Sequence, residues 1–448
     1  MSSLKERLLC DENIYLTIYS VNSYINNKEL LNYNDRKKLY ELNDKFNYKI
    51  ISKTIKEVRT NIENIIEDDG FLKSKVYFKP KKYEAEEGKV IFRPVHTASL
   101  IEQITTIAML NILIYKIDAE KKISISNLSR LIPNNFYGNR ISTDVEVLFK
   151  PWYKQYQKYT SKANELFKKY HESQDYKWEV DLDLTNFFPS INPVSLYNYI
   201  LTKLDVNMPK DDEKLIKKIL EKLIFIKLEN TNVNELQLYK QRNKITSNEN
   251  DLYFDNKGFT IGIPQGLPHT YFLGNLCMIE IQKIYEQHIP GEMLFYVDDS
   301  VVFTNAIKDY EDFDNKIEQI NKSIDKWQKD NFNIYVNSFN NEVSEYISLE
   351  GFKEYFTIEV HKAGDKSTIT NILDSKDGEV FLSSLSRESS ITAFDINSIY
   401  SDEESSILYN RIKIILEMIE KEIALQESKK NEDKNTREAY LKKLTRYN

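Results

Sequence analysis

The stretch that most constrains the fold is FYVDDSVVF at 295–303, in which two short apolar runs meet at a pair of adjacent aspartates. The β-branched and aromatic residues of both runs predict a β-hairpin with Asp298 and Asp299 at its tip. The commonest tight hairpins prefer Asn-Gly or Asp-Gly, because both central residues need a positive φ. Carboxylates among apolar residues are costly to desolvate unless a cation neutralises them. The tip is therefore a candidate site for a divalent metal ion, and an ordinary hairpin with an acidic turn is the alternative.

Composition limits what else the chain can be. Its 448 residues are enough for two or three domains, and 41% hydrophobic with 29% charged residues is typical of a soluble globular protein. The net charge of −7 excludes a surface covered in basic residues, so any nucleic-acid surface must be local. Cys10 and Cys277 lack metal-ligand spacing, which fits a reducing cytoplasm. No signal peptide is recognisable, and the most apolar segment, 98–117, contains polar residues typical of a buried helix.

A second acidic segment runs from Trp178 to Thr185, where hydrophobic and acidic residues alternate. This period of two predicts a strand with one hydrophobic face and one row of carboxylates. The hydrophobic residues are Val180, Leu182 and Leu184, and the acidic ones are Glu179, Asp181 and Asp183. Asp183 is the last carboxylate of the row, and the aromatic segment before Pro189 follows it.

The remaining pattern predicts mostly helices. We expect helices within residues 1–70, after a break near Pro151, and over 211–227, 271–285, 307–332 and 402–425. Basic β-type runs on either side of a short acidic turn predict a hairpin over 75–94, with Arg93 available to bind phosphate. Short strands are expected at 334–336 and 356–360, and a loop or hairpin in the polar stretch 230–250. His96 is expected to pack or cap, and Arg140 to bind carbonyls or phosphates.

Five motifs occur in order between about residues 90 and 300: FRP at 92–94, FYGNR at 136–140, DLTNFFPSI at 183–191, GIPQGLP at 262–268 and FYVDD at 295–299. Together they resemble the motifs of reverse transcriptases. The GNR loop and the PQGL turn are most similar to the bacterial defence-associated branch, with its unknown-group and abortive-infection enzymes. The resemblance implies an α+β right-hand polymerase fold. Fingers and N-terminal helices would occupy 1–177, a palm with an antiparallel sheet 178–350, and a small, mostly helical thumb-like region 351–448.

The resemblance also implies a metal site. Asp183, Asp298 and Asp299 match the catalytic carboxylates, and the backbone carbonyl of Leu184 is a further candidate metal ligand. Such a set would hold two Mg²⁺ ions, for which Mn²⁺ could substitute. Paired metals of this kind serve in-line phosphoryl transfer, since hard cations favour oxygen ligands.

Four other residues match nucleotide-binding positions of the family. Arg93 resembles the fingers arginine that grips the incoming triphosphate, and Lys89 is a second candidate for phosphate contact. Gln265 is similar to the glutamine that lies against the nucleotide sugar. Phe188 occupies the place of the bulky aromatic that blocks a 2′-hydroxyl, which implies deoxynucleotides as substrates.

The chain departs from the family in places. The segment Asn337-Ser-Phe-Asn340 lacks the lysine often found after the acidic hairpin, and no late Val-Thr-Gly segment of the retron type occurs. The last 100 residues or so are too few for an RNase H domain. The expected function is a cytoplasmic DNA polymerase in antiviral defence that uses dNTPs and either an associated noncoding RNA or no ordinary template. A retron-like enzyme and a non-catalytic RNA-binding scaffold are the alternatives. Tyrosine priming, a homo-oligomer and a partner defence protein all stay open, and no membrane partner is expected.

Overall fold

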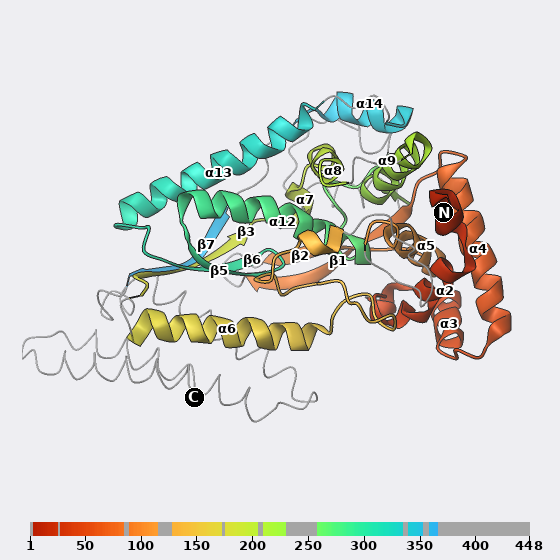
Figure 1. The fold of residues 1–448 in the computed structure, drawn as a ribbon, viewed down its shortest axis with the longest axis horizontal. Helices are drawn as coiled ribbons and strands as arrows, with labels where there is room; N and C mark the ends of the chain where they lie inside the picture. The colour runs from red at the N-terminus through yellow and green to blue at the C-terminus, as the bar shows by residue number, and fades with distance from the viewer. Residues whose placement is uncertain are drawn as a thin grey trace, which may run out of the picture. The chain divides into compact units, whose positions relative to one another are not determined.

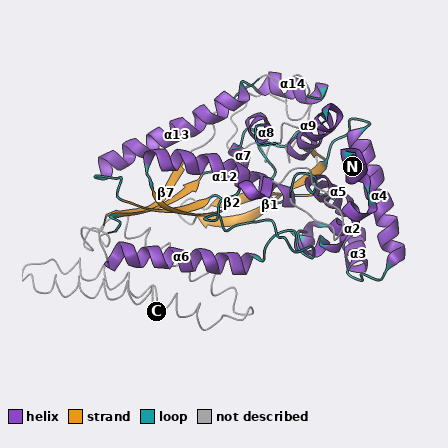
Figure 2. Cartoon of the chain, in the orientation of Figure 1, coloured by secondary structure: helices purple, strands orange, loops and turns teal. Residues whose placement is uncertain are grey.

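The computed structural model describes residues 3–25, 27–84, 89–114, 128–172, 175–204, 209–229, 258–334, 339–352 and 358–365. The fold is mixed α+β, as the sequence predicts (Figures 1 and 2). The chain forms two compact units and passes between them repeatedly. The first unit contains Met1–Trp152, Thr185–Lys283 and Asn321–Thr357, and the second contains Tyr153–Leu184, Ile284–Ile320 and the chain from Ile358.

The first unit begins with a group of helices, as expected for residues 1–70. They are α1 (Leu4–Leu9), α2 (Asp11–Tyr19), α3 (Tyr33–Leu42), α4 (Tyr48–Ile66) and, after a hairpin, α5 (Leu100–Leu110), with short 3₁₀ turns at Val21–Ser23, Lys28–Leu30 and Leu128–Leu131. Buried residues of α4 recur at helical spacing, at Ile51, Val58, Ile62 and Ile65. Two buried amides support the packing, because Asn13 Nδ2 donates to the carbonyl of Ala108 at 3.0 Å and Asn111 Nδ2 donates to Asn13 Oδ1 at 3.1 Å.

The predicted basic hairpin is present in the first unit. It consists of β1 (Lys73–Glu84) and β2 (Lys89–Thr97), which pair antiparallel from Lys75↔Thr97 onward. The two-residue β4 (Lys227–Leu228) joins β1 in parallel, so the strand order is β2-β1-β4 and β2 lies at an edge. The unit's remaining helices are α7 (Phe187–Ser190), α8 (Pro193–Leu201), α9 (Lys210–Ile224) and α14 (Asn341–Glu350). Helix α12 (Pro268–His288) begins here, and α13 (Tyr310–Phe332) ends here.

The second unit is built on an antiparallel sheet of order β5-β6-β3-β7. Its strands are β3 (Trp178–Leu184), β5 (Gly291–Tyr296), β6 (Asp299–Thr304) and β7 (Ile358–Asp365). On one face, Phe295 stacks on Tyr285 of α12 with ring centres 6.2 Å apart. On the other, Phe303 contacts Tyr170 of α6 (Trp152–Glu172), also at 6.2 Å. The sheet therefore lies between helices (Figure 1).

Several predicted elements lie partly or wholly outside the described residues, namely the 402–425 helix, the 230–250 loop and most of the 334–336 strand. The long helical stretch expected after residue 140 begins only with α6 at Trp152, directly after Pro151, and residues 141–150 are not helical. The expected helix over 98–117 is shorter, since α5 ends at Leu110 and turns follow. Within the described part of the chain, no helix combines the length and the apolar character needed to cross a membrane.

Candidate active site

The second unit places the three predicted aspartates at one end of its sheet. Strand β5 ends at Tyr296 and β6 starts at Asp299, so the predicted hairpin is confirmed, with Val297 and Asp298 as its two-residue loop. On the other side of β6, the ladder with β3 runs from Trp178↔Thr304 to Leu182↔Ser300. One step further along these two strands come Asp183 and Asp299. Long-range register therefore brings together carboxylates that lie far apart in the sequence.

The hairpin loop is formed by other residues than the sequence predicts. Its central residues are Val297 and Asp298, not the two aspartates, and only Val297 has a positive φ, of 62°. A positive φ at the first central residue alone is the pattern of a type II′ turn, which usually has glycine there. A β-branched residue in this region is a genuine conformational outlier and costs about 1–3 kcal/mol. The valine carries the strain, and the aspartates do not.

The row of carboxylates on β3 is less open than the alternation predicts. Glu179 is buried, with 1% of its surface exposed, because β6 and β7 flank it at Phe303 and Gly364. Asp183 and Asp298 are half-buried, and Asp299 is exposed. Asp181 is half-buried like Asp183, so the predicted row of carboxylates includes one fully buried member, at Glu179.

The donor chemistry at this end would suit Mg²⁺, because Asp183, Asp298 and Asp299 offer carboxylate oxygens. No group of three or more His, Cys, Asp or Glu side chains forms a ready metal cage among the described residues. Mg²⁺ commonly uses one or two protein carboxylates and completes its shell with water and substrate phosphates. An Mg²⁺ ion at these aspartates would therefore need further oxygen ligands, from water or a phosphate, to complete its shell.

Two tyrosines next to this end were not singled out from the sequence. Tyr285 on α12 is buried, and its hydroxyl lies near the Ser300 side chain of β6. Burial, together with the nearby charge of Asp183, raises the pKa of Tyr285. Tyr296, which pairs with Asp299, packs edge-on against Tyr156 of α6 at 5.3 Å, and burial raises its pKa to about 12. Sequence periodicity gives no signal for the first, whereas proximity to the aspartates could have flagged the second.

In the first unit, the GIPQGLP turn lies along the outer edge of β2. The backbone nitrogen of His96 donates to the carbonyl of Gln265 at 2.7 Å. Gly266 has φ +115°, and a Cβ there would come within 2.4 Å of the His96 carbonyl oxygen. Between residues 261 and 270, Gln265 alone is not buried. The turn therefore holds its backbone against the strand and leaves the Gln265 side chain accessible.

The same turn also contacts the segment after β3. The nitrogen of Ile263 donates to the Phe188 carbonyl at 3.0 Å, and a Cβ on Gly262 would meet that oxygen at 2.3 Å. The ring of Phe188 is only 3% exposed and packs edge-on against Tyr271 at 5.5 Å. The structure thus gives Phe188 a packing role, and its part in sugar discrimination rests on the resemblance.

The two predicted phosphate contacts lie on the hairpin of the first unit. Arg93 is exposed on β2 opposite Lys79. It lies three residues, or about 10 Å, from His96 and the turn that His96 holds. Lys89 opens β2 opposite Glu84, and the structure describes only its backbone. Arg93, Gln265 and Phe188 therefore belong to one unit, while the three aspartates belong to the other.

Two further residues of the motifs have structural roles. Arg140 donates to the carbonyls of Phe136 at 2.8 Å and Ile132 at 3.2 Å, and also to that of Pro133. The carbonyl interpretation of Arg140 is therefore confirmed. His96 is buried beside Ser74 Oγ, 3.3 Å from its Nδ1, and burial lowers its pKa to about 3, as suits a neutral packing residue.

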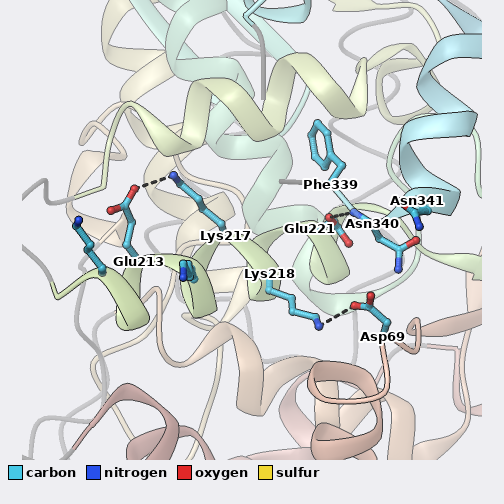
Figure 3. Close-up of a pocket in the computed structure, with 10 residues that line it drawn as sticks. Asp69, Glu213, Lys217, Lys218, Glu221, Phe339, Asn340 and Asn341 are labelled. Atoms are coloured by element: carbon cyan, nitrogen blue, oxygen red, sulfur yellow. Dashed lines mark hydrogen bonds and ion pairs between the residues drawn. The ribbon is translucent and has the colours of Figure 1, made fainter. Parts of the chain in front are cut away.

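A separate pocket of about 650 Å³ lies in the first unit, between α9 and the start of α14 (Figure 3). Much of its charge is paired. Lys217 lies 2.7 Å from Glu213, and Lys218 lies 2.7 Å from Asp69. Glu221 accepts a hydrogen bond from the Asn340 nitrogen at 2.9 Å. The first pair lies within α9, the second joins α9 to Asp69, and the hydrogen bond joins α9 to Asn340. These interactions do not by themselves identify a ligand.

No family model matches the chain, and no curated protein matches it either. The function proposed below is therefore based on the site residues and their arrangement.

Proposed function

We propose that this protein is a Mg²⁺-dependent DNA polymerase of the reverse-transcriptase type, with a fingers-palm fold, that acts in antiviral defence. The observation that carries the proposal is the placement of Asp183, Asp298 and Asp299 at one end of a single antiparallel sheet. The motif order and the accessible Gln265 on its glycine-flanked turn support it.

In this proposal, the three aspartates hold the metal ions, with the Leu184 carbonyl as an additional ligand. Bound Mg²⁺ would lower the cost of deprotonating the primer hydroxyl and would offset charge on the leaving pyrophosphate. The contribution of the chain is geometric. β3 and the β5–β6 hairpin are hydrogen-bonded elements of one sheet, and such elements position side chains more exactly than free loops do.

The nucleotide contacts are proposed for Arg93, Lys89, Gln265 and Phe188, as the resemblance implies. The guanidinium of Arg93 can bind phosphate oxygens through two parallel hydrogen bonds, which a lysine such as Lys89 cannot do. Gln265 lies against the sugar. Phe188 would disfavour ribonucleotides, the role that the resemblance implies for it.

The test is incorporation of labelled nucleotide by the purified full-length chain. We would supply Mg²⁺ and each dNTP or NTP, without added template, and digest the products with DNase, RNase or protease. Labelled DNA is the expected product, and it should disappear in Asp298→Asn/Asp299→Asn. Glu311→Gln is the matched control, because Glu311 is an exposed carboxylate of the same unit. Its activity should equal that of the wild type.

Further treatments separate the versions of the proposal. Loss of product after RNase pretreatment would indicate a bound RNA template, and a product that shifts with protease would indicate protein priming. A discrete product copied from one structured RNA would favour the retron-like version. If the double aspartate variant incorporates nucleotide as well as the wild type, or if neither chain does and phage protection survives the substitutions, the polymerase proposal is wrong.

A further inference from the structure

A cluster of exposed aromatic rings stands out in the first unit, on α3 and the start of α4. Four large aromatic residues within sixteen positions have most of their surface in solvent: Tyr33 at 73%, Tyr40 at 78%, Phe46 at 79% and Tyr48 at 68%. Exposed hydrophobic residues usually occur singly, and a contiguous exposed patch generally marks a binding surface. We call Tyr33, Arg36, Lys37 and Tyr40 the α3 aromatic face.

The rings share one side of α3 with two cations. Residues three, four and seven positions apart lie on one side of a helix, so Arg36 and Lys37 fall between Tyr33 and Tyr40. The two tyrosines are about 10 Å apart along the axis. The opposite side of α3 supplies the buried Leu39 and Leu42, which shows that the helix is anchored by other residues. The tyrosines are not needed for its packing.

The local charge is also distinctive. Residues 33–49 contain five Lys or Arg and three Asp or Glu, whereas the whole chain carries −7. Lys37 Nζ lies 4.0 Å from Glu41 Oε1, which is a long distance for an ion pair. In the part of the chain that the structure describes, neither Arg36 nor Lys49 has an ion-pair partner. These cations are available to an anionic ligand.

We infer that the α3 aromatic face binds single-stranded nucleic acid. Two rings with two cations between them suit this ligand, because bases stack on aromatic side chains while phosphates contact Lys and Arg. A protein partner fits less well, since lysine is depleted from the centre of protein interfaces and Lys37 lies between the two rings. The inference concerns a surface of the first unit, outside the proposed catalytic residues, and does not require polymerase activity.

The experiment measures binding of fluorescently labelled single-stranded RNA and DNA oligonucleotides by anisotropy. It uses the full-length Asp298→Asn/Asp299→Asn chain in EDTA, so that failure of the polymerase proposal leaves the result interpretable. Tyr33→Ala/Tyr40→Ala should weaken binding by about tenfold or more, since each stacked base contributes on the order of a tenfold effect. Tyr33→Phe/Tyr40→Phe should retain the affinity, because the ring is kept.

The cations have a separate signature. Arg36→Ala/Lys37→Ala should reduce the slope of log K against log salt by about 0.7 for each phosphate that the protein no longer neutralises. Leu349→Ala is the matched control, because Leu349 is 65% exposed in the same unit and lies in no aromatic cluster. Its affinity should not change.

Three results would overturn the inference. The first is no binding by the parent chain, and the second is equal binding by the alanine and parent chains. The third is a change in the sedimentation of the tyrosine variants with oligonucleotide binding unchanged, which would assign the face to a protein contact. Photo-crosslinking with a thiouridine oligonucleotide adds a direct readout, because peptides from residues 33–49 should carry the crosslink.

Discussion

Replacing Gly266 by alanine tests whether the Gln265 turn depends on its close approach to β2. The new Cβ would lie 2.4 Å from the His96 carbonyl oxygen and 3.0 Å from the His96 nitrogen, where an ordinary contact is 3.4 Å or more. The turn must therefore move by about 1 Å, which breaks a hydrogen bond contributing about 0.5–1.5 kcal/mol. The positive φ of +115° adds about 1–3 kcal/mol of strain for a residue with a side chain. The expected total loss of stability is about 2–4 kcal/mol.

Gly351→Ala is the control, because Gly351 also has a positive φ, of +61°, but nothing lies within 4 Å of its Cβ position. This variant should lose only the strain, about 1–3 kcal/mol. Urea unfolding compares the two variants, and hydrogen exchange of peptides covering residues 93–99 reports the His96 amide directly. We expect faster exchange there in Gly266→Ala alone. Equal destabilisation of both variants with unchanged His96 protection would refute the argument that the turn is held by its contact with β2.

Other perturbations follow from buried charge and backbone strain. Burial raises the pKa of Glu102 to about 7. The protonated side chain therefore contributes its full stability below about pH 4.5, and this contribution is lost as the pH rises through 7. At pH 8, Glu102→Gln should be more stable than the wild type by up to about 3 kcal/mol in urea unfolding. Lys222 is buried with its Nζ 3.2 Å from Glu221. Lys222→Met should therefore cost about 3–5 kcal/mol of folding stability, because it leaves a buried charge unpaired. In a double-mutant cycle, Lys222→Met/Glu221→Gln should lose less stability than the sum of the two single changes. Val297→Gly should keep or raise the free energy of unfolding, because glycine relieves the strain of the positive φ. It should also lower nucleotide incorporation, because glycine no longer fixes the conformation of the turn.

The sequence predicts local elements of this fold well where the pattern itself is local. The hairpin around Asp298 and the strand that ends at Leu184 follow from composition and from alternation with a period of two. Alternation does not predict which of these strands pair with each other. Strand β3 lies between β6 and β7, and this arrangement decides that Glu179 is buried while Asp183 is half-buried. Alternation gives the face to which a side chain points, and neighbouring strands decide whether that face is covered.

The site residues show the same difference between local structure, which the sequence predicts, and tertiary packing, which it does not. The flanking glycines of Gln265 predict a tight turn, but only the structure shows that the turn lies on the edge of β2 and leaves this one side chain accessible. Phe188 is an aromatic residue after a strand in sequence, and its burial against Tyr271 depends on α12, which comes much later in the chain. Nothing in the sequence around Tyr285 connects it with Asp183, so its placement near that carboxylate is purely tertiary information.

The backbone offers an independent reason to look for function at the hairpin. Two tight turns carry predicted site residues, Gln265 in the first unit and Asp298 in the second, and each turn contains a positive φ. In the first unit, glycines 262 and 266 adopt it at little cost, with φ of +59° and +115°. In the second unit Val297 adopts it at φ 62°, although glycine would relieve the strain. Strain of this kind persists only where the surrounding structure fixes the conformation, and it concentrates at sites that need a fixed geometry. The strained residue directly precedes Asp298, which is where the proposed chemistry requires a carboxylate to be held in place.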